Sequence, residues 1–161
     1  MSRILGTGRN AALLQDVKAL APDRIDVHAV GDGDLSAWVR EHNNGEGADI
    51  VIDAVGPGAP AESFTDALAT LRRGGIAVDI GGMMERPALD LFSMMCSQIS
   101  LVGSLWFSTR EAQEMAEMAG SGALDLSVLE HHIFPLDQIN EALDSIPARH
   151  GGFTNFICQP S

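Results

Sequence analysis

The sequence contains no tyrosine and a single lysine, Lys18, among its 161 residues. Reductases that depend on a Tyr-Lys pair, and NTPases that bind phosphate through a Gly-Lys-Ser/Thr loop, need residues that this chain does not offer in those patterns. Both classes of enzyme are therefore excluded by composition.

Basic residues are scarce as a group, with 10 Lys plus Arg against 22 Asp plus Glu and a formal net charge of −12 at pH 7. An acidic surface repels nucleic-acid phosphates and anionic lipid headgroups, and the apolar runs are too short to span a membrane. We therefore expect no nucleic-acid partner and no membrane partner. The first residues carry no basic stretch followed by a long apolar run, so no secretory signal and a cytoplasmic location are predicted.

Cysteine is also rare, because the chain has only Cys96 and Cys158. Two cysteines so far apart fit neither a disulfide framework nor a CxxC zinc site. The sequence predicts two buried free thiols in a reducing compartment.

Short apolar runs alternate with segments of helical period, a pattern typical of βα units around a parallel sheet in a single α/β domain. The runs predicted as strands are 4–5, 25–29, 48–55, 76–80, 99–106 and 153–158. Residues 25–29 alternate apolar and polar side chains, which favours an edge strand. Residues 48–55 are almost continuously apolar, so this strand is predicted in the interior of the sheet with helices on both faces.

Several helices are marked by their first and last residues. Asn10, Asp34 and Ser108 are predicted N-caps, and Ser108 has the capping-box spacing to Glu111. Residues 64–71 form an apolar stripe, followed by two arginines in the predicted last turn and Gly74 as the predicted end of the helix. Further helices are predicted over 13–21, over 35–39, from 108 to 119 with Ala112, Met115, Ala116 and Ala119 inward, and over 136–146 after a turn at Phe134-Pro135.

In an open α/β sheet, ligands bind beyond the carboxyl ends of the strands, where glycines allow the backbone to approach them closely. Residues 6–11, Gly-Thr-Gly-Arg-Asn-Ala, match the pattern G-x-G-x-x-A, and Asp32 follows about twenty residues later. Taken alone, this match is compatible with a dinucleotide fingerprint or with an ordinary tight turn capped by Asn10.

From Arg3 onward the chain resembles the second half of a zinc-type alcohol dehydrogenase of the medium-chain dehydrogenase/reductase superfamily. The phrases that carry the resemblance are Ile-Leu-Gly-Thr-Gly-Arg-Asn (4–10), Gly-Ala-Asp-Ile-Val-Ile-Asp-Ala-Val-Gly (47–56), Leu-Arg-Arg-Gly-Gly-Ile-Ala-Val-Asp-Ile-Gly-Gly (71–82), Ile-Ser-Leu-Val-Gly-Ser-Leu-Trp (99–106) and Phe-Pro-Leu-Asp-Gln-Ile-Asn-Glu-Ala-Leu (134–143). The fold it implies is a partial Rossmann domain: a doubly wound parallel sheet that lacks the first strand and its Gly-rich turn. The implied domains are residues 1–123, a partial dinucleotide-binding domain, and residues 124–161, which in the family pack toward a catalytic domain.

The resemblance changes the interpretation of the first turn, because it places the pyrophosphate-binding glycines before the point where this chain begins. Residues 6–10 are instead predicted to face the adenosine ribose, where an acidic side chain would select NAD. Arg9 suits a 2′-phosphate, so NADP is favoured over NAD. The alternative for Arg9 is a solvated side chain in the first turn of a helix.

The remaining cofactor contacts follow from the positions of the matched phrases, with close packing as the alternative for each. The predicted cofactor-binding residues are Gly6, Thr7, Gly8, Arg9, Asn10, Val55, Gly56, Ile80, Gly81, Gly82, Ser104, Leu105 and Trp106. The resemblance places 55–56 at the adenosine side, 80–82 near the nicotinamide, and 104–106 at its carboxamide.

No catalytic and no metal-binding residue is predicted in this chain. The resemblance places the zinc ligands and the proton relay in an N-terminal domain that this sequence does not include. The His131-His132 pair lacks a third ligand at a suitable spacing and points to two faces, so it is interpreted as structural or exposed. Asp49, Asp53 and Asp79 are interpreted as polar residues within strands.

The sequence thus indicates the cofactor-binding part of an NAD(P)-dependent oxidoreductase that transfers hydride between the cofactor and an alcohol or carbonyl, inactive on its own. The family's strand order predicts a gap between strands 4–5 and 48–55, open to another chain or closed by direct pairing. It also implies a homo-oligomer formed through the edge strand Ile99–Trp106. The alternatives are an assembly module that kept the fold but lost the dinucleotide site, and a smaller nucleotide-binding domain in which 6–11 is a true first fingerprint.

Overall fold

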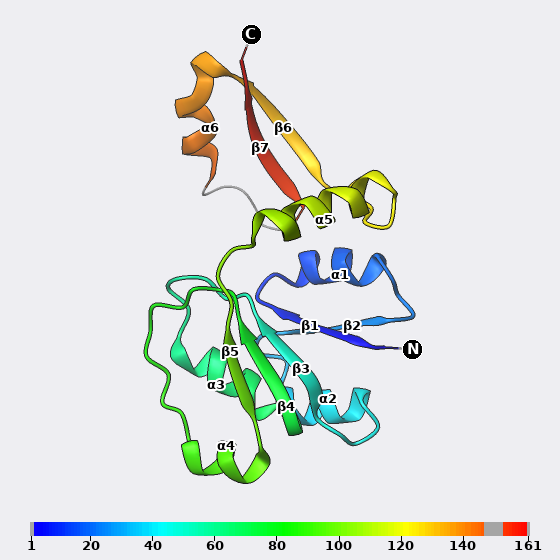
Figure 1. The fold of residues 1–161 in the computed structure, drawn as a ribbon, viewed down its shortest axis with the longest axis vertical. Coiled ribbons are helices and arrows are strands. Elements are labelled where there is room, and N and C mark those ends of the chain that lie inside the picture. The colour runs from blue at the N-terminus through cyan, green and yellow to red at the C-terminus, as the bar shows by residue number, and fades with distance from the viewer. Residues whose placement is uncertain (1, 147–152, 161) are drawn as a thin grey trace. The chain divides into compact units, whose positions relative to one another are not determined.

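The protein is described by a computed structural model covering residues 2–146 and 153–160. The chain forms two compact units, Met1–Trp106 and Phe107–Ser161, which are described separately here (Figure 1). Both units combine helices with parallel strands, so the predicted α/β class is confirmed. No helix among the described residues has the length and apolar character that crossing a membrane requires.

Strands and helices alternate along the first unit, as the sequence predicts. Their bounds are β1 (Ile4–Gly8), α1 (Ala11–Ala19), β2 (Ile25–Ala29), α2 (Leu35–His42), β3 (Ala48–Asp53), α3 (Ala61–Ala69), β4 (Leu71–Asp79), α4 (Leu91–Ser97) and β5 (Ser100–Gly103). Each strand pair is parallel, and a helix connects each strand to the next. This is the arrangement expected of βαβ units.

The first two strands form a sheet of their own. β1 pairs with β2 in register from Ile4 opposite Ile25 to Gly8 opposite Ala29. α1 packs on this pair and buries Leu14. Its first residue follows Asn10, whose side-chain oxygen accepts a hydrogen bond from the Leu13 N–H at 3.1 Å, as predicted. β2 lies at an edge, which confirms the interpretation of its alternating pattern.

The second sheet has the order β3-β4-β5, and the core of the unit lies between this sheet and α3. Phe64 of α3 is 5% exposed, and Ala77 of β4 is fully buried. Asp34 caps α2 by accepting from the Ala37 N–H, as predicted. Because the strands are parallel, the loops that follow β3, β4 and β5 all begin at the same edge of this sheet, its carboxyl edge.

The prediction that residues 48–55 form an interior strand covered on both faces is wrong for this chain. β3 is an edge strand of its sheet, and Ile50 and Ile52 are 59% and 65% exposed. Alternate side chains of a strand point to opposite faces, and α3 covers only the other face. Among the described residues no strand pairs with the free edge of β3, so the predicted gap is present and β1 does not close it.

The boundary between α3 and β4 also differs from the prediction. The helix ends at Ala69, and the segment from Leu71 onward, with both arginines, already belongs to β4. Ala48 N–H donates to the Thr70 carbonyl at 2.8 Å and Ala48 pairs with Leu71, so pairing with β3 ends the helix early. Gly74 adopts its positive φ of 74° inside β4 rather than after a helix.

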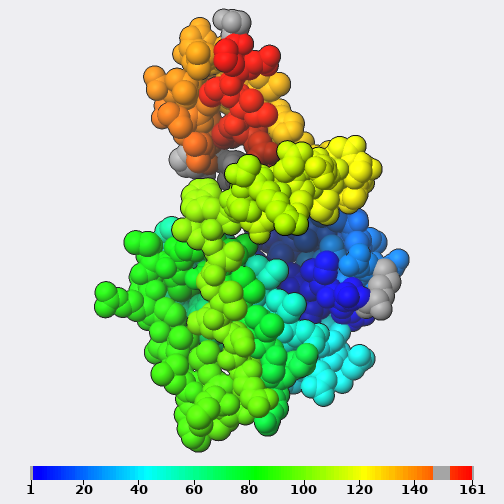
Figure 2. All heavy atoms as spheres, viewed as in Figure 1, coloured from blue at the N-terminus to red at the C-terminus, as the bar shows by residue number. Residues whose placement is uncertain are grey.

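β4 and β5 are only partly buried. Ile76 and Ile80 are exposed on the face that α3 leaves open. β5 spans four residues, all exposed, instead of 99–106, and it lies at the surface in the space-filling view (Figure 2). Both cysteines are free, but Cys96 is exposed and Cys158 is only partly covered, so the prediction of buried thiols is wrong. No residue of α4 is buried.

The second unit contains α5 (Thr109–Gly120), β6 (Glu130–Pro135), the 3-10 helix η1 (Leu136–Gln138), α6 (Ile139–Ser145) and β7 (Thr154–Gln159). β6 and β7 are parallel, and His132 and Phe134 each pack edge-on against Phe156 at 5.6 Å between ring centroids. The predicted turn at Phe134-Pro135 is instead the end of β6.

The capping box of α5 is confirmed: Glu111 accepts from the Ser108 N–H at 2.7 Å and the Ser108 hydroxyl accepts from the Glu111 N–H. The prediction that one face of α5 points inward is wrong, because Met115 and Ala116 are exposed and no residue of α5 is buried. The apolar side chains of η1 and α6 and of the residue that follows are exposed, with Leu136, Ile139, Leu143 and Ile146 each about half accessible. The domain boundary at 123/124 stays a prediction.

Candidate functional site

The carboxyl ends of β3 and β4 lie side by side, since Asp53 pairs with Asp79 in register. The loops that follow touch each other through Gly81. A Cβ on Gly81 would lie 2.5 Å from the Val55 nitrogen and 2.7 Å from the Ala54 carbonyl carbon, closer than side chains pack. The structure therefore brings Val55 and Gly81, which were predicted from separate phrases, into direct contact.

Two more predicted glycines border this contact. A Cβ on Gly56 would come within 3.9 Å of the Gly81 carbonyl oxygen. Gly82 has a positive φ of 73° and open space where a side chain would be. Backbone without side chains is what a flat ring or a sugar needs for close approach, so the two loops offer a surface suited to such a ligand.

The third loop joins the same edge. The Ser104 N–H donates to the Asp79 carbonyl at 2.9 Å, and the Ile80 N–H donates to the Asp53 carbonyl at 2.9 Å. Leu105 and Trp106 are largely exposed, and Trp106 has a φ of 59° in the left-handed region, which is uncommon for a bulky side chain. The predicted residues after β3, β4 and β5 therefore form one continuous set of loops.

Of the predicted residues 6–10, Gly6, Thr7 and Gly8 are the last three of β1, in the other sheet, and Arg9 and Asn10 follow it and lead into α1. Arg9 is exposed and forms no ion pair or hydrogen bond with the residues that the structure describes. A Cβ on Gly8 would lie 3.4 Å from Leu14, so a small residue suits this turn. Asp32 accepts from the Ala29 N–H at 3.3 Å, so its carboxylate caps the turn after β2.

Asp53 is the residue that sequence reasoning missed. It is 4% exposed, and its Oδ2 has no hydrogen-bond partner among the described residues. Burial raises the pKa of Asp53, the backbone N–H of Val55 lowers it by hydrogen bonding, and the charge of Asp79 raises it. The available signal was an aspartate within one or two residues of the end of each of two predicted apolar strands, 48–55 and 76–80.

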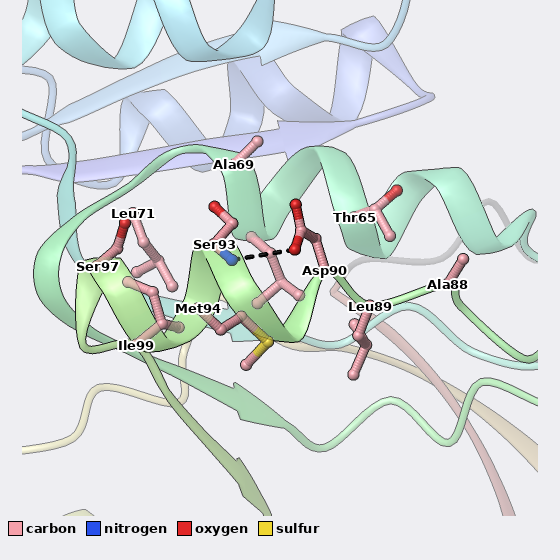
Figure 3. Close-up of a pocket in the computed structure, with 11 residues that line it drawn as sticks. Thr65, Ala69, Leu71, Ala88, Leu89, Asp90, Ser93, Met94, Ser97 and Ile99 are labelled. Atoms are coloured by element: carbon pink, nitrogen blue, oxygen red, sulfur yellow. Dashed lines mark hydrogen bonds between the residues drawn. The ribbon is translucent and has the colours of Figure 1, made fainter.

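A separate cavity of about 260 Å³ lies between α3 and α4 (Figure 3). Leu71 and Ile99, at the amino ends of β4 and β5, form part of its wall together with Leu68, Leu89 and Met94. Asp90 closes one side and caps α4 by accepting from the Ser93 N–H at 3.0 Å. Because this is the opposite edge of the sheet, the cavity contains none of the predicted cofactor residues.

Metal-ligating side chains do not converge in the part of the chain that the structure describes: no three His, Cys, Asp or Glu residues there could hold one ion. His131 and His132 are successive residues of β6, and His132 packs on Phe156. The donor set therefore does not fit a zinc ion.

Comparisons with known proteins agree with the geometry. The family described as zinc-binding dehydrogenase matches residues 1–121. The alcohol dehydrogenase of Geobacillus stearothermophilus is 28% identical over 111 residues, which is 69% of this chain and 31% of that protein. A probable quinone oxidoreductase of Schizosaccharomyces pombe is 28% identical over 153 residues, 88% of this chain and 45% of that protein.

Among solved structures, an alcohol dehydrogenase from Thermus sp. ATN1 matches 98% of this chain and 44% of its own, with a TM-score of 0.81 and 20% identity. This likeness confirms the fold as a partial Rossmann doubly wound sheet. The chain spans less than half the length of these relatives.

Proposed function

The chain belongs to the zinc-binding dehydrogenase family, and on this premise we propose that it is the cofactor-binding part of an NAD(P)-dependent oxidoreductase. The observation that carries the proposal is the contact between Val55 and Gly81. It brings together two glycine-containing loops at the carboxyl edge of the sheet. Dinucleotides bind at this edge in open α/β sheets.

The proposed roles follow the three loops. Val55 and Gly56 line the adenosine side, Ile80–Gly82 lie near the nicotinamide, and Ser104–Trp106 offer backbone groups to its carboxamide. When bound, the cofactor supplies the hydride chemistry, exchanging a hydride with an alcohol or carbonyl. This chain's share is to bind and orient the dinucleotide. Since its described residues do not fit zinc, we propose that it does not turn over an alcohol on its own.

We propose a preference for NADP over NAD through Gly6–Asn10. Arg9 is exposed, follows the last residue of β1 and is not engaged by the described residues, so its guanidinium can pair with a 2′-phosphate. No acidic side chain occupies this turn to hold a 2′-hydroxyl.

We also propose a homodimer in a reducing cytoplasm, formed where the exposed edge strand β5 pairs with a second copy across a two-fold axis. The residues predicted for this contact are Ile99–Trp106.

A second candidate function is an assembly module that binds another polypeptide instead of a dinucleotide. The specific observation in its favour is the open face of the second sheet, where Ile50, Ile52, Ile76 and Ile80 are exposed beside the free edge of β3. Such an apolar face with an unpaired edge is a common site of protein association.

Calorimetric titration with NADPH and with NADH, at low and high salt, separates the two candidates. We expect NADPH to bind more tightly and its affinity to fall with salt. Arg9→Ala should weaken NADPH binding about tenfold, as the loss of one charge-assisted hydrogen bond implies, and leave NADH unchanged.

The matched control is Arg110→Ala, which removes an equal charge from an exposed helical position of the second unit. Equal affinity for both nucleotides would contradict only the role of Arg9. Absence of binding to either nucleotide would contradict the proposed function and favour the assembly module.

A further inference from the structure

Two carboxylates lie directly beneath the proposed dinucleotide loops. Asp53 and Asp79 are the last residues of β3 and β4, and they pair in register, so their side chains share one face of the sheet. The Asp53 side chain is buried, with Oδ2 unpartnered, whereas Asp79 is partly exposed and its Oδ1 accepts the Gly81 N–H at 3.1 Å.

Asp53 also supports the loop that touches Gly81. Its carboxylate accepts the backbone N–H of Val55, and its own carbonyl accepts the Ile80 N–H at 2.9 Å. Val55 and Gly81 are in direct backbone contact. A change in the charge of Asp53 therefore acts on the β3 loop through the Val55 N–H, and on the β4 loop through its neighbour Asp79, whose carboxylate accepts the Gly81 N–H.

Apart from the Val55 N–H, no group among the described residues balances a negative charge on Asp53. Asp79 faces it from β4, and the carboxylates of α3, Glu62 and Asp66, are exposed to solvent. No cation pairs with Asp53 among the described residues, and Arg72, on β4, is held by Asp49. Burial and Asp79 both raise the pKa of Asp53, which favours its protonated form.

We propose that Asp53 is a positioning residue through which proton uptake from solvent tightens dinucleotide binding at the β3 and β4 loops. This inference rests on the proposed function. Protonation removes one of two adjacent negative charges beneath loops that receive a ligand whose net charge is negative. Protonation also turns the unpartnered Oδ2 into a hydroxyl that can donate a hydrogen bond. The loss of its charge relieves the repulsion between the two carboxylates.

The test is a titration of the full chain with NADP⁺, whose oxidised ring withstands acid, at several values from about pH 8 to about pH 4.5, a range that lies above the ordinary pKa of an aspartate. Circular dichroism at each pH verifies that the chain is folded. We expect the affinity of the wild-type chain to rise roughly fivefold or more toward acid, the lower end of usual coupling factors between two sites.

Asp53→Asn keeps an acceptor for the Val55 N–H but cannot ionise, so its affinity should be higher at neutral pH and lack this pH dependence. Asp66→Asn removes an exposed carboxylate from α3 and should retain the wild-type profile. Asp79→Asn leaves Asp53 intact and should reduce the pH dependence, which keeps the test decisive if Asp53→Asn does not fold.

Identical pH profiles in the wild type and both strand-end variants overturn this inference while leaving the proposed function intact. Absence of NADP⁺ binding by the wild type at every pH overturns both. The inference is supported if the affinity for NADP⁺ rises toward acid pH in the wild type and in Asp66→Asn but not in Asp53→Asn.

Discussion

The two faces of the β3-β4-β5 sheet differ in burial, and the exposed face is the more apolar of the two. On one face Phe64 of α3 covers the strands, and Ala77 and Asp53 are buried. On the other face Ile50 and Ile52 stand exposed. The difference shows that burial here depends on which helices the chain itself supplies, and not on how apolar a strand is. The open face is apolar enough for a partner and contributes little to the stability of this chain.

The largest expected effect comes from removing the aromatic ring on the covered face. Phe64→Ala should lower the free energy of unfolding by about 3–5 kcal/mol, because it leaves a cavity beneath α3. Urea denaturation followed by circular dichroism measures the change. The matched substitution on the open face, Ile52→Ala, should change stability by at most about 0.5 kcal/mol. Equal losses at both positions would mean that the two faces are equally covered in solution.

A second, smaller effect is expected at the contact between the loops. Gly81→Ala places a Cβ against the backbone of Val55, so we expect a loss of about 1–3 kcal/mol in stability, as overpacking usually costs, and a clear loss of dinucleotide affinity. Thermal unfolding and calorimetry measure the two quantities. Gly120→Ala is the control, because no atom lies within 4 Å of its added Cβ. Unchanged binding in Gly81→Ala would separate this contact from the ligand site.

The smallest expected effect is the pH dependence of stability that Asp53 contributes. Its pKa is raised in the folded state by burial, so its contribution to stability is fully present below its unfolded pKa and is lost as pH rises through the folded pKa. Unfolding free energies of the wild type and Asp53→Asn should therefore diverge toward neutral pH, with the variant more stable there. A constant difference between the two proteins across pH would show that the pKa of Asp53 is the same in the folded and the unfolded state.

Local signals in the sequence predicted much of this fold correctly. Asn10, Asp34 and Ser108 cap helices as expected, because an N-cap satisfies backbone donors within a few residues and needs no distant partner. The alternation of strands and helices was equally predictable from periodicity. Features that depend on residues distant in the sequence could not be predicted in this way. For example, the pairing of Ala48 with Leu71 makes the end of the helix predicted over 64–71 part of a strand.

The candidate site shows the same division. Glycines after each strand could be identified from the sequence, and the register of β3 with β4 then places them together. The burial of Asp53 could not be predicted, since an aspartate favours solvent and its burial depends on neighbours brought by tertiary packing, such as the paired end of β4. The exposure of Ile50 and Ile52 could not be predicted either, since the sequence pattern of an apolar strand does not show whether helices cover one of its faces or both.

The parallel pairing of every strand pair among the described residues also determines how this chain reaches its fold. No hairpin brings neighbouring strands together early, so each pair forms only after the intervening helix has crossed back over the sheet. Until then the isoleucine-rich strands have unsatisfied backbone groups and apolar side chains exposed at the same time. Folding yield should therefore decline with chain concentration, since intermolecular strand pairing competes with these slow crossovers.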